Sequence, residues 1–417
     1  MSTLAAYRRV LGGRQFRRYF VGESISSFGD AMSEVTVLIY AMQLAQGSTK
    51  PIAIALASAA YLVPGIATGV LAGRHLARLR PRTLLLIDSA WRGGTLSAAA
   101  LLAAFNGLNL TGYLILLSLA SLSRPLAGAG SRALTRELVD RDSLFTANTL
   151  LASAVQTASM VGPALAGILI AATDAGLVLG IDALSFLVFA MVLLTVRSAP
   201  APSQQADVED KARRGIGWLR DYPTILGLFI LVALFLILYG PFVVGLPLIA
   251  EQRAGQWSAE TVLGVLWSAF GIGAVLGNLL VGARRSLAHS RTAALIAAAW
   301  GAVTIVVAVP AHLAVALIAM LIGGLVYAPY TAILSTVMQR HLPESRLKEA
   351  SAYYVAVTSS AGPLGTLLGG LLVASVSATS GLAIDGAVLV AVGLAMAWLL
   401  RTPDHTAHPV EVMEQQA

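Results

Sequence analysis

The 417-residue chain contains no cysteine and only three lysines, and charged residues make up 12% of it. The absence of cysteine excludes disulfides and thiolate metal sites. Its six histidines show no metal-ligand spacing outside the last residues, so we expect neither a metal nor a cofactor. There is no GxxxxGK[ST] phosphate loop and no Ser/His/Asp arrangement. These absences argue against an enzyme and against ATP as the energy source.

Low charge and high apolar content place the chain in a membrane. A soluble domain carries about 25% charged residues, whereas 57% of this chain is hydrophobic and its mean hydropathy is +0.77. Apolar runs of about 20 residues, enough to cross a bilayer as helix, recur throughout. They lack the alternation of barrel strands, so we predict an all-α integral membrane protein with twelve transmembrane helices. The predicted spans are 19–45, 51–73, 82–105, 111–131, 146–172, 175–196, 223–250, 260–283, 291–310, 312–338, 349–376 and 380–401.

The basic residues predict how these spans are oriented. Cytoplasmic loops of membrane proteins are enriched in Lys and Arg. With the amino terminus in the cytoplasm, cytoplasmic segments hold 24 of the 28 Lys and Arg residues, whereas external loops hold only Lys50 and Arg253. We therefore expect both termini in the cytoplasm and a bacterial inner-membrane location. The net charge of +7 then needs no nucleic-acid partner.

The two halves of the chain resemble each other. VQTASMVGP (155–163) aligns with VAVTSSAGP (355–363), and LGID (179–182) aligns with LAID (382–385). Parallel six-helix repeats with alternating access are a known transporter architecture. The sequence therefore predicts two pseudo-symmetric six-helix bundles. The predicted division is an N-terminal bundle at 1–196, a cytoplasmic linker at 197–222, a C-terminal bundle at 223–401 and a cytoplasmic tail at 402–417.

Several motifs resemble those of the major facilitator superfamily, especially its proton-coupled drug, macrolide and siderophore exporters. RRYFVGESISSFGDAMSEV resembles the first helix of that branch, and RPLAGAG (124–130) resembles its fourth-helix motif, with Ala127 in place of the usual Gln. VGPALAG (161–167) resembles the exporter motif of the fifth helix. The resemblance implies a secondary-active transporter with a small-molecule substrate and protons as partners, functioning as a monomer.

The motif between the second and third helices departs from the family pattern. GVLAGRHLARLRPR (69–82) retains Gly69 and Arg74, but Gly73 stands where the family usually has Asp. In similar transporters that acid helps to latch the cytoplasmic side. We therefore expect a weakened or rebuilt latch here.

The first predicted span carries three acids, Glu23, Asp30 and Glu34. At about 100° per residue they lie within a roughly 60° arc of the helix, and such residues face protein or a water-filled cavity rather than lipid. With a rise of about 1.5 Å per residue, Glu23 falls in the first turn and Asp30 near the midplane. Glu23 suits either an interfacial carboxylate or a further proton-coupling residue. Asp30 and Glu34 suit either a structural ion pair or proton coupling.

Arginines in the third and fourth spans supply candidate partners for these acids. Asp88 and Arg92 are four residues apart and can pair along their own helix. Arg124 has no acid in its own helix and must find a partner elsewhere. In similar exporters the Arg of the fourth-helix motif takes part in proton coupling, so the resemblance implies this role for Arg124.

Two further acids stand at equivalent places in the halves. Asp182 and Asp385 each lie near the external end of the last span of their half. In the superfamily those helices are peripheral, so we expect an interfacial structural role. The seventh span has no internal acid, which would confine coupling chemistry to the first half.

Glycine and proline mark sites of close approach and bending. Gly65, Gly69 and Gly73 recur every fourth residue, a spacing that lets helices approach closely. Gly162-Pro163 and Gly362-Pro363 interrupt backbone hydrogen bonding and can kink their helices. Ordinary close packing is the alternative in each case.

Three functions remain compatible with the sequence. The first is proton-coupled efflux of a small hydrophobic or cationic compound such as a drug, antibiotic or siderophore. The second is an importer or facilitator of a small metabolite. The third is a membrane receptor or scaffold that does not transport.

Overall fold

A computed structural model describes residues 3–76, 79–140, 143–197, 216–282, 289–309 and 312–400. All regular structure in these ranges is helical. Most of the predicted linker and the whole predicted tail lie outside the described residues, so the division into two bundles with these boundaries stays a prediction.

The helices fall into two groups that pack mainly within themselves. The first group contains α1 (Thr3–Gly12), α2 (Arg14–Leu44), α3 (Lys50–Leu76), α4 (Pro81–Ala104), α5 (Leu110–Ser121), α6 (Arg124–Leu138), α7 (Leu144–Ala172) and α8 (Ala175–Thr195), with the short helix η1 (Gly47–Thr49) before α3. The second group contains η3 (Ile216–Asp221), α9 (Pro223–Gln252), α10 (Ala259–Gly282), α11 (Ser290–Ala308), α12 (Leu313–Tyr327), α13 (Tyr330–His341), α14 (Glu344–Ser375) and α15 (Ala378–Leu399).

Ten membrane-spanning candidates in the described residues are long and apolar enough to cross a bilayer. The helices α2 and α4, with 31 and 24 residues, are also long enough but are absent from that set. Each carries several charged residues, among them Asp30 in α2 and Arg92 in α4. These charged residues lower the mean hydropathy of α2 and α4. Asp30 and Arg92 among them belong to the site described below.

Two of the predicted spans are broken into pairs of helices. The predicted span 111–131 consists of α5 and the start of α6, and 312–338 consists of α12 and most of α13. Pro125 lies at the start of α6, and Pro329 is the N-cap of α13. Proline lacks the N–H that would continue the preceding helix, so each span divides at a proline. The first break places Arg124 at the beginning of α6.

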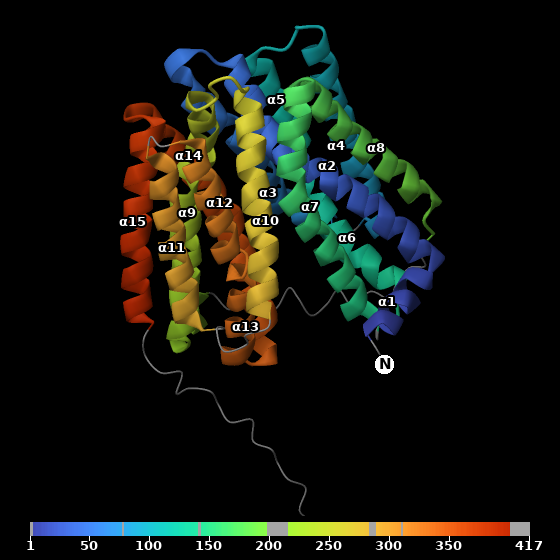
Figure 1. The fold of residues 1–417 in the computed structure, drawn as a ribbon. Helices are drawn as coiled ribbons and strands as arrows, with labels where there is room; N and C mark the ends of the chain where they lie inside the picture. Colours follow the sequence, from blue (N-terminus) through green and yellow to red (C-terminus); the bar gives the residue numbers. More distant parts are fainter. Residues whose placement is uncertain are drawn as a thin grey trace, which may run out of the picture.

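The two groups meet at one end of the molecule and diverge toward the other (Figure 1). The end where they diverge holds α1 and the last turn of α15, and we call it the terminal end. The opposite end, which holds the α2–α3, α7–α8 and α9–α10 connections, is called the distal end. The main contacts between the groups join α7 to α10 and α3 to α14.

Polar contacts between the groups lie at the distal end. Lys50 at the start of α3 forms an ion pair with Glu251 near the end of α9. Gln43 of α2 donates a hydrogen bond of 2.8 Å to Glu260 of α10. These two polar pairs connect the first helix group to the second at the distal end.

Glycines allow the helices to cross closely near the same end. A Cβ on Gly264 of α10 would lie 2.9 Å from Gly167 Cα of α7. Gly370 of α14 likewise abuts Ala55 of α3. The structure is therefore closed at the distal end by direct backbone packing.

Candidate functional site

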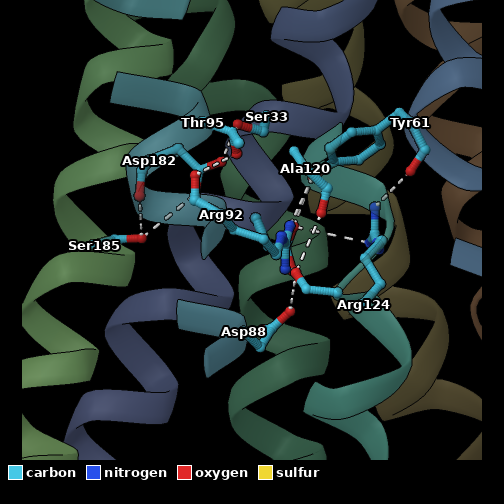
Figure 2. A network of polar contacts seen from close by, with 11 residues as sticks. Ser33, Tyr61, Asp88, Arg92, Thr95, Ala120, Arg124, Asp182 and Ser185 are labelled. Carbon is cyan, nitrogen blue, oxygen red and sulfur yellow. Dashed lines mark hydrogen bonds and ion pairs between the residues drawn. The ribbon is translucent and has the colours of Figure 1, made fainter. Parts of the chain in front are cut away.

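Asp30 is the centre of a polar network inside the first helix group. Figure 2 shows its partners Tyr61, Arg92 and Arg124 together with Asp88 and Asp182. Tyr61 of α3 donates a hydrogen bond of 2.7 Å to its Oδ1. Arg92 of α4 binds both carboxylate oxygens, through Nη1 to Oδ2 at 3.1 Å and through Nη2 to Oδ1. Such a two-pronged pair fixes geometry and is stronger than a neutral hydrogen bond. Three helices thus converge on one acid.

Arg124 lies at the edge of the same network. Its Nη2 is 3.9 Å from Asp30 Oδ1, its Nη1 donates to the Tyr61 backbone carbonyl at 3.4 Å, and its Cζ lies 4.4 Å from the centre of the Tyr61 ring. The Arg124 side chain is 25% exposed and that of Asp30 30%, whereas that of Arg92 is 3% exposed. Arg92 is therefore the buried partner of Asp30, and Arg124 is the partner nearer to open space.

The pairing within α4 that the sequence left open is not the one observed. Arg92 reaches across to Asp30, while Asp88 accepts a hydrogen bond of 2.7 Å from Ser123 Oγ, which lies next to the α5–α6 break. The Arg92 guanidinium also lies 4.0 Å above the Phe186 ring of α8. A buried arginine is stabilised by several partners together, and a helix partner four residues away could not supply them all.

Asp182 was expected at the membrane interface, and the structure shows that this is wrong. Its exposed fraction is 0%, and Ser33 of α2 donates a hydrogen bond to its Oδ2. Ser185 donates to its backbone carbonyl at 2.8 Å. Gly29 allows the approach, because a Cβ there would lie 2.9 Å from Ser185 Cβ and 2.5 Å from Asp182 Oδ1.

Asp385, the equivalent acid of the second group, is also buried rather than interfacial, with 2% exposed. Neither of its carboxylate oxygens has a hydrogen-bond partner among the described residues. The two halves therefore have an acid at the equivalent position but in different surroundings. Among the described residues, no hydroxyl group of the second helix group binds Asp385 as Ser33 binds Asp182.

Glu23 forms no hydrogen bond or ion pair with Asp30 among the described residues, although it interacts electrostatically with Asp88 and Asp30. It is partly buried beside Ser131 of α6, whose hydroxyl is 2.6 Å from Tyr19 Oη. It therefore faces protein from the terminal half of α2. Its separation from Asp30 agrees with the depth inferred from the helical rise.

Glu34 lies in a different environment, in a cavity of about 370 Å³ between the two helix groups. We call this the central cavity. Among the described residues that line it, Glu34 is the one that carries a charge. The lining residues are Glu34, Val35 and Leu38 of α2, Gln156, Ser159 and Pro163 of α7, and Tyr239, Val243, Trp267, Phe270, Ala274, Tyr327, Ala328 and Thr331 from the second helix group. The volume falls within the range of small-molecule sites.

The wall opposite Glu34 is aromatic, with the rings of Tyr239, Trp267, Phe270 and Tyr327 among the lining residues. Trp300 of α11 is buried behind this wall, with ring centroids 5.1 Å from Phe242, 5.5 Å from Tyr327 and 5.6 Å from Phe270. Aromatic faces attract cations and stack on planar rings. An acid facing such a wall suits a ligand that is both apolar and positively charged.

The small residues of the sequence motifs have distinct contacts. A Cβ on Gly69 would lie 3.3 Å from Pro125, so α3 packs on the start of α6 there. Gly162 abuts Ala31 of α2, within the first helix group, and Pro163 lines the central cavity. Gly73 and Arg74 lie in α3, in a stretch whose side chains are outside the described part of the structure.

The second-half motif does not reproduce these contacts. A Cβ on Gly362 would meet nothing within 4 Å, whereas its first-half equivalent is tightly packed. Pro363 lies inside α14. The repeat in sequence therefore marks equivalent positions in the chain rather than equivalent packing.

Several residues of the site could not be identified from the sequence. Tyr61 and Ser33 are ordinary residues of apolar helices, and only the packing of α3 and α8 on α2 shows that they bind acids. The aromatic wall and the rings packed behind it come from four helices, α9, α10, α11 and α12. Asp182 stands out in the sequence because it is an acid within an apolar run. The sequence does not show, however, which residues lie beside it.

The chain matches the family of transmembrane secretion effectors over residues 2–416 and belongs to it. It is 27% identical over 354 residues to an uncharacterized MFS-type transporter of Sinorhizobium fredii, covering 84% of this chain and 86% of that protein. It is 27% identical over 290 residues to the enterobactin exporter EntS of Shigella flexneri, covering 65% and 66% of the two chains. The family places the chain in the exporter branch of the major facilitator superfamily.

Solved structures of transporters share the fold. The nucleoside transporter NupG superposes with a TM-score of 0.70 at 13% identity, covering 93% of this chain and 99% of its own. An auto-inhibited peptide transporter of the POT family gives 0.71 at 14% identity, covering 97% and 99%. The protein is a multi-pass membrane transporter of the major facilitator type.

Proposed function

We propose that the protein exports a small hydrophobic or cationic compound across the bacterial inner membrane in exchange for protons. Twelve helices would cross the membrane as two six-helix bundles that alternate access to the central cavity, with both termini in the cytoplasm. In that orientation the conformation described is open to the cytoplasm and closed to the outside. Export agrees with the function of the related enterobactin exporter EntS.

The observation that carries this proposal is the network at Asp30. A carboxylate held by one buried arginine and approached by a second, partly exposed arginine is costly in a membrane, and its stability depends on the protonation of the acid. The Asp30 side chain is 30% exposed, so it can exchange protons with water that enters between the helix groups. When the transporter changes from opening toward one side of the membrane to opening toward the other, Asp30 exchanges protons with the water on that other side.

The cargo site would be the central cavity. Glu34 would attract the positive charge of a cargo molecule, and the aromatic wall would receive its rings. Since Glu34 and Asp30 lie about one helical turn apart on α2, the charge of a bound cation would favour the deprotonated form of both. Cargo and protons would therefore compete, which is the requirement for exchange.

Inverted membrane vesicles test this proposal, with ethidium as a planar aromatic cation and enterobactin as the cargo of the relative. We expect an imposed proton gradient, acid inside, to drive accumulation of at least one of them, and Asp30→Asn to abolish it. If neither accumulates, or if Asp30→Asn transports like the unaltered protein, the proposal fails. Downhill movement that survives collapse of the gradient would instead indicate a facilitator.

A further inference from the structure

Asp182 is the acid of the network without a cation of its own. Ser33 and Ser185 are its hydrogen-bond partners, and its exposed fraction is 0%. Hydroxyl groups can satisfy a carboxyl oxygen but cannot cancel its charge. Placing an uncompensated charge at this depth in a bilayer is costly.

The charges around Asp182 do not balance if every acid is ionised. The network contains two arginines, Arg92 and Arg124, and three aspartates, Asp30, Asp88 and Asp182. Both arginines approach Asp30, and both also act on Asp88, which Ser123 further stabilises. Glu34 and Glu23 of α2 add further negative charge beside Asp30. The acids therefore outnumber the arginines, and Asp182, whose hydrogen-bond partners are hydroxyl groups, is the acid of this network that a proton neutralises.

The charged groups on the helices around Asp182 include one cation that acts on it. The helices α2, α4 and α7 pack against α8. Asp30 of α2 and Arg92 of α4 act on it, as does Tyr61 of α3 from further away. The described residues of α7 include no ionisable side chain. Arg92 is thus the one cation that Asp182 could acquire.

Arg92 is placed to serve either acid. Its two terminal nitrogens bind Asp30, while its Nε has no partner among the described residues. Asp182 is four residues before Phe186 on α8, and the Phe186 ring lies 4.0 Å from the same guanidinium. Figure 2 shows Asp182 on the helix beside Arg92. Movement of Arg92 toward α8 would exchange one acid for the other.

We propose that Asp30 and Asp182 share one proton, that Arg92 pairs with whichever of them is ionised, and that Asp182 holds the proton in the conformation described. The proposal rests on proton coupling as the function and adds a second proton-binding residue to it. Asp182 is then a store inside the bundle, and Asp30 is the point of exchange with the cavity.

The transfer between the acids conserves atoms and charge. The O–H bond of Asp182 breaks, and an O–H bond forms on a carboxylate oxygen of Asp30. Ser33 lies three residues from Asp30 on the same helix, where such residues are neighbours. Its hydroxyl, which donates to Asp182 in the conformation described, would turn to accept the proton of Asp182 and pass its own proton to Asp30. Arg92 moves in the opposite sense, from Asp30 to Asp182, so the net charge of the network is unchanged. Asp30 then releases the proton to the cavity.

Transport by Asp182→Asn tests the proposal, because asparagine imitates an acid that never loses its proton. We expect proton-driven accumulation of ethidium to fall about tenfold or more, while exchange of ethidium for ethidium, which needs no net proton movement, stays within about twofold. Asp385→Asn removes the equivalent buried acid of the second helix group and is the matched control, expected to leave both activities unchanged. Retained proton-driven accumulation in Asp182→Asn would overturn the inference.

Infrared spectroscopy of the full chain in liposomes gives a second measurement that does not depend on transport. We expect a C=O stretching band of a protonated carboxylic acid that shifts in D₂O and is lost in Asp182→Asn. In Asp30→Asn, Arg92 has only Asp182 left to pair with, so the band should also be lost there, and it should return when Asp30→Asn is combined with Arg92→Gln. A spectrum that Asp182→Asn leaves unchanged would overturn the assignment. If the unaltered protein shows no proton-driven transport but the band behaves as described, the proposed function fails while the proton on Asp182 stands.

Discussion

At the scale of single residues, the described conformation depends on Arg92. Its side chain is almost completely buried, and it holds Asp30 through two hydrogen bonds while stacking on Phe186. Removing one partner of a buried ion pair leaves the other charge uncompensated. The stability of the first helix group should therefore be sensitive to this one side chain.

Replacing Arg92 with alanine should destabilise the protein by about 3–5 kcal/mol, the cost of leaving a buried charge unpaired. Arg82→Ala is the matched control, since Arg82 donates to the Leu194 carbonyl at an exposed position and should cost no more than about 1.5 kcal/mol. Thermal unfolding of the purified proteins in one detergent gives both values. The double variant Arg92→Gln with Asp30→Asn should lose less stability than Arg92→Ala. Equal losses for Arg92→Ala and Arg82→Ala would contradict the role given to Arg92.

Glu34 should set the preference for charge rather than the stability of the fold. It is exposed to the central cavity and has no cation within ion-pair distance among the described residues. Glu34→Gln should weaken ethidium binding about tenfold, equivalent to about 1.4 kcal/mol, and leave a neutral aromatic ligand unaffected. Fluorescence titration measures both, and Glu137→Gln, outside the cavity, is the control. A similar loss for the neutral ligand would show that Glu34 shapes the cavity rather than attracting charge.

At the scale of elements, α7 and α10 form the closest contact between the groups. They cross at Gly167 and Gly264 without intervening side chains, which is the geometry that small residues permit between membrane helices. The Lys50–Glu251 ion pair lies at the same end. Closure at the distal end therefore depends on backbone contact, with charge pairs as an addition.

A side chain on Gly167 should prevent that closure. The Cβ of Gly167→Val would lie 2.8 Å from Gly264 N, so the helices must separate and the distal-open state should gain population. Distances between spin labels at Gln46→Cys and Ser258→Cys, which flank the distal end, should lengthen in Gly167→Val. Gly94→Val is the control, because a Cβ there meets nothing within 4 Å. An unchanged distance distribution in Gly167→Val would show that this crossing does not govern closure.

The elements were largely predictable, and their contacts were not. Every predicted span coincides with one helix or with a pair divided at Pro125 or Pro329. Helical spacing also placed the acids of α2 on one face. The pairing of Asp30 with Arg92, however, depends on how α4 packs against α2, and the place of Asp182 depends on Gly29 admitting α8. Neither contact follows from the periodicity of the sequence. Periodicity shows which residues share one face of a helix, but it does not show which other helix packs against that face.

At the scale of the whole molecule, the account requires one orientation in the membrane. Basic residues gather at the terminal end, and the distal loops are poor in them. The lack of native cysteine makes the chain suitable for labelling with membrane-impermeant thiol reagents. In right-side-out vesicles, Ser48→Cys and Ser258→Cys should react from outside, while Ser143→Cys should react only after permeabilisation. The reverse pattern would invert the topology and, with it, the direction of transport.

The central claim is that movement of cargo and movement of protons are the same event. Coupling between two ligands is reciprocal, so a cargo gradient alone must move protons. The most direct measurement uses liposomes containing the purified protein, an ethidium gradient, no imposed pH gradient and a pH-sensitive dye inside. We predict proton movement opposite to that of ethidium, absent in Asp30→Asn. Ethidium movement in the unaltered protein without any proton movement would contradict the account.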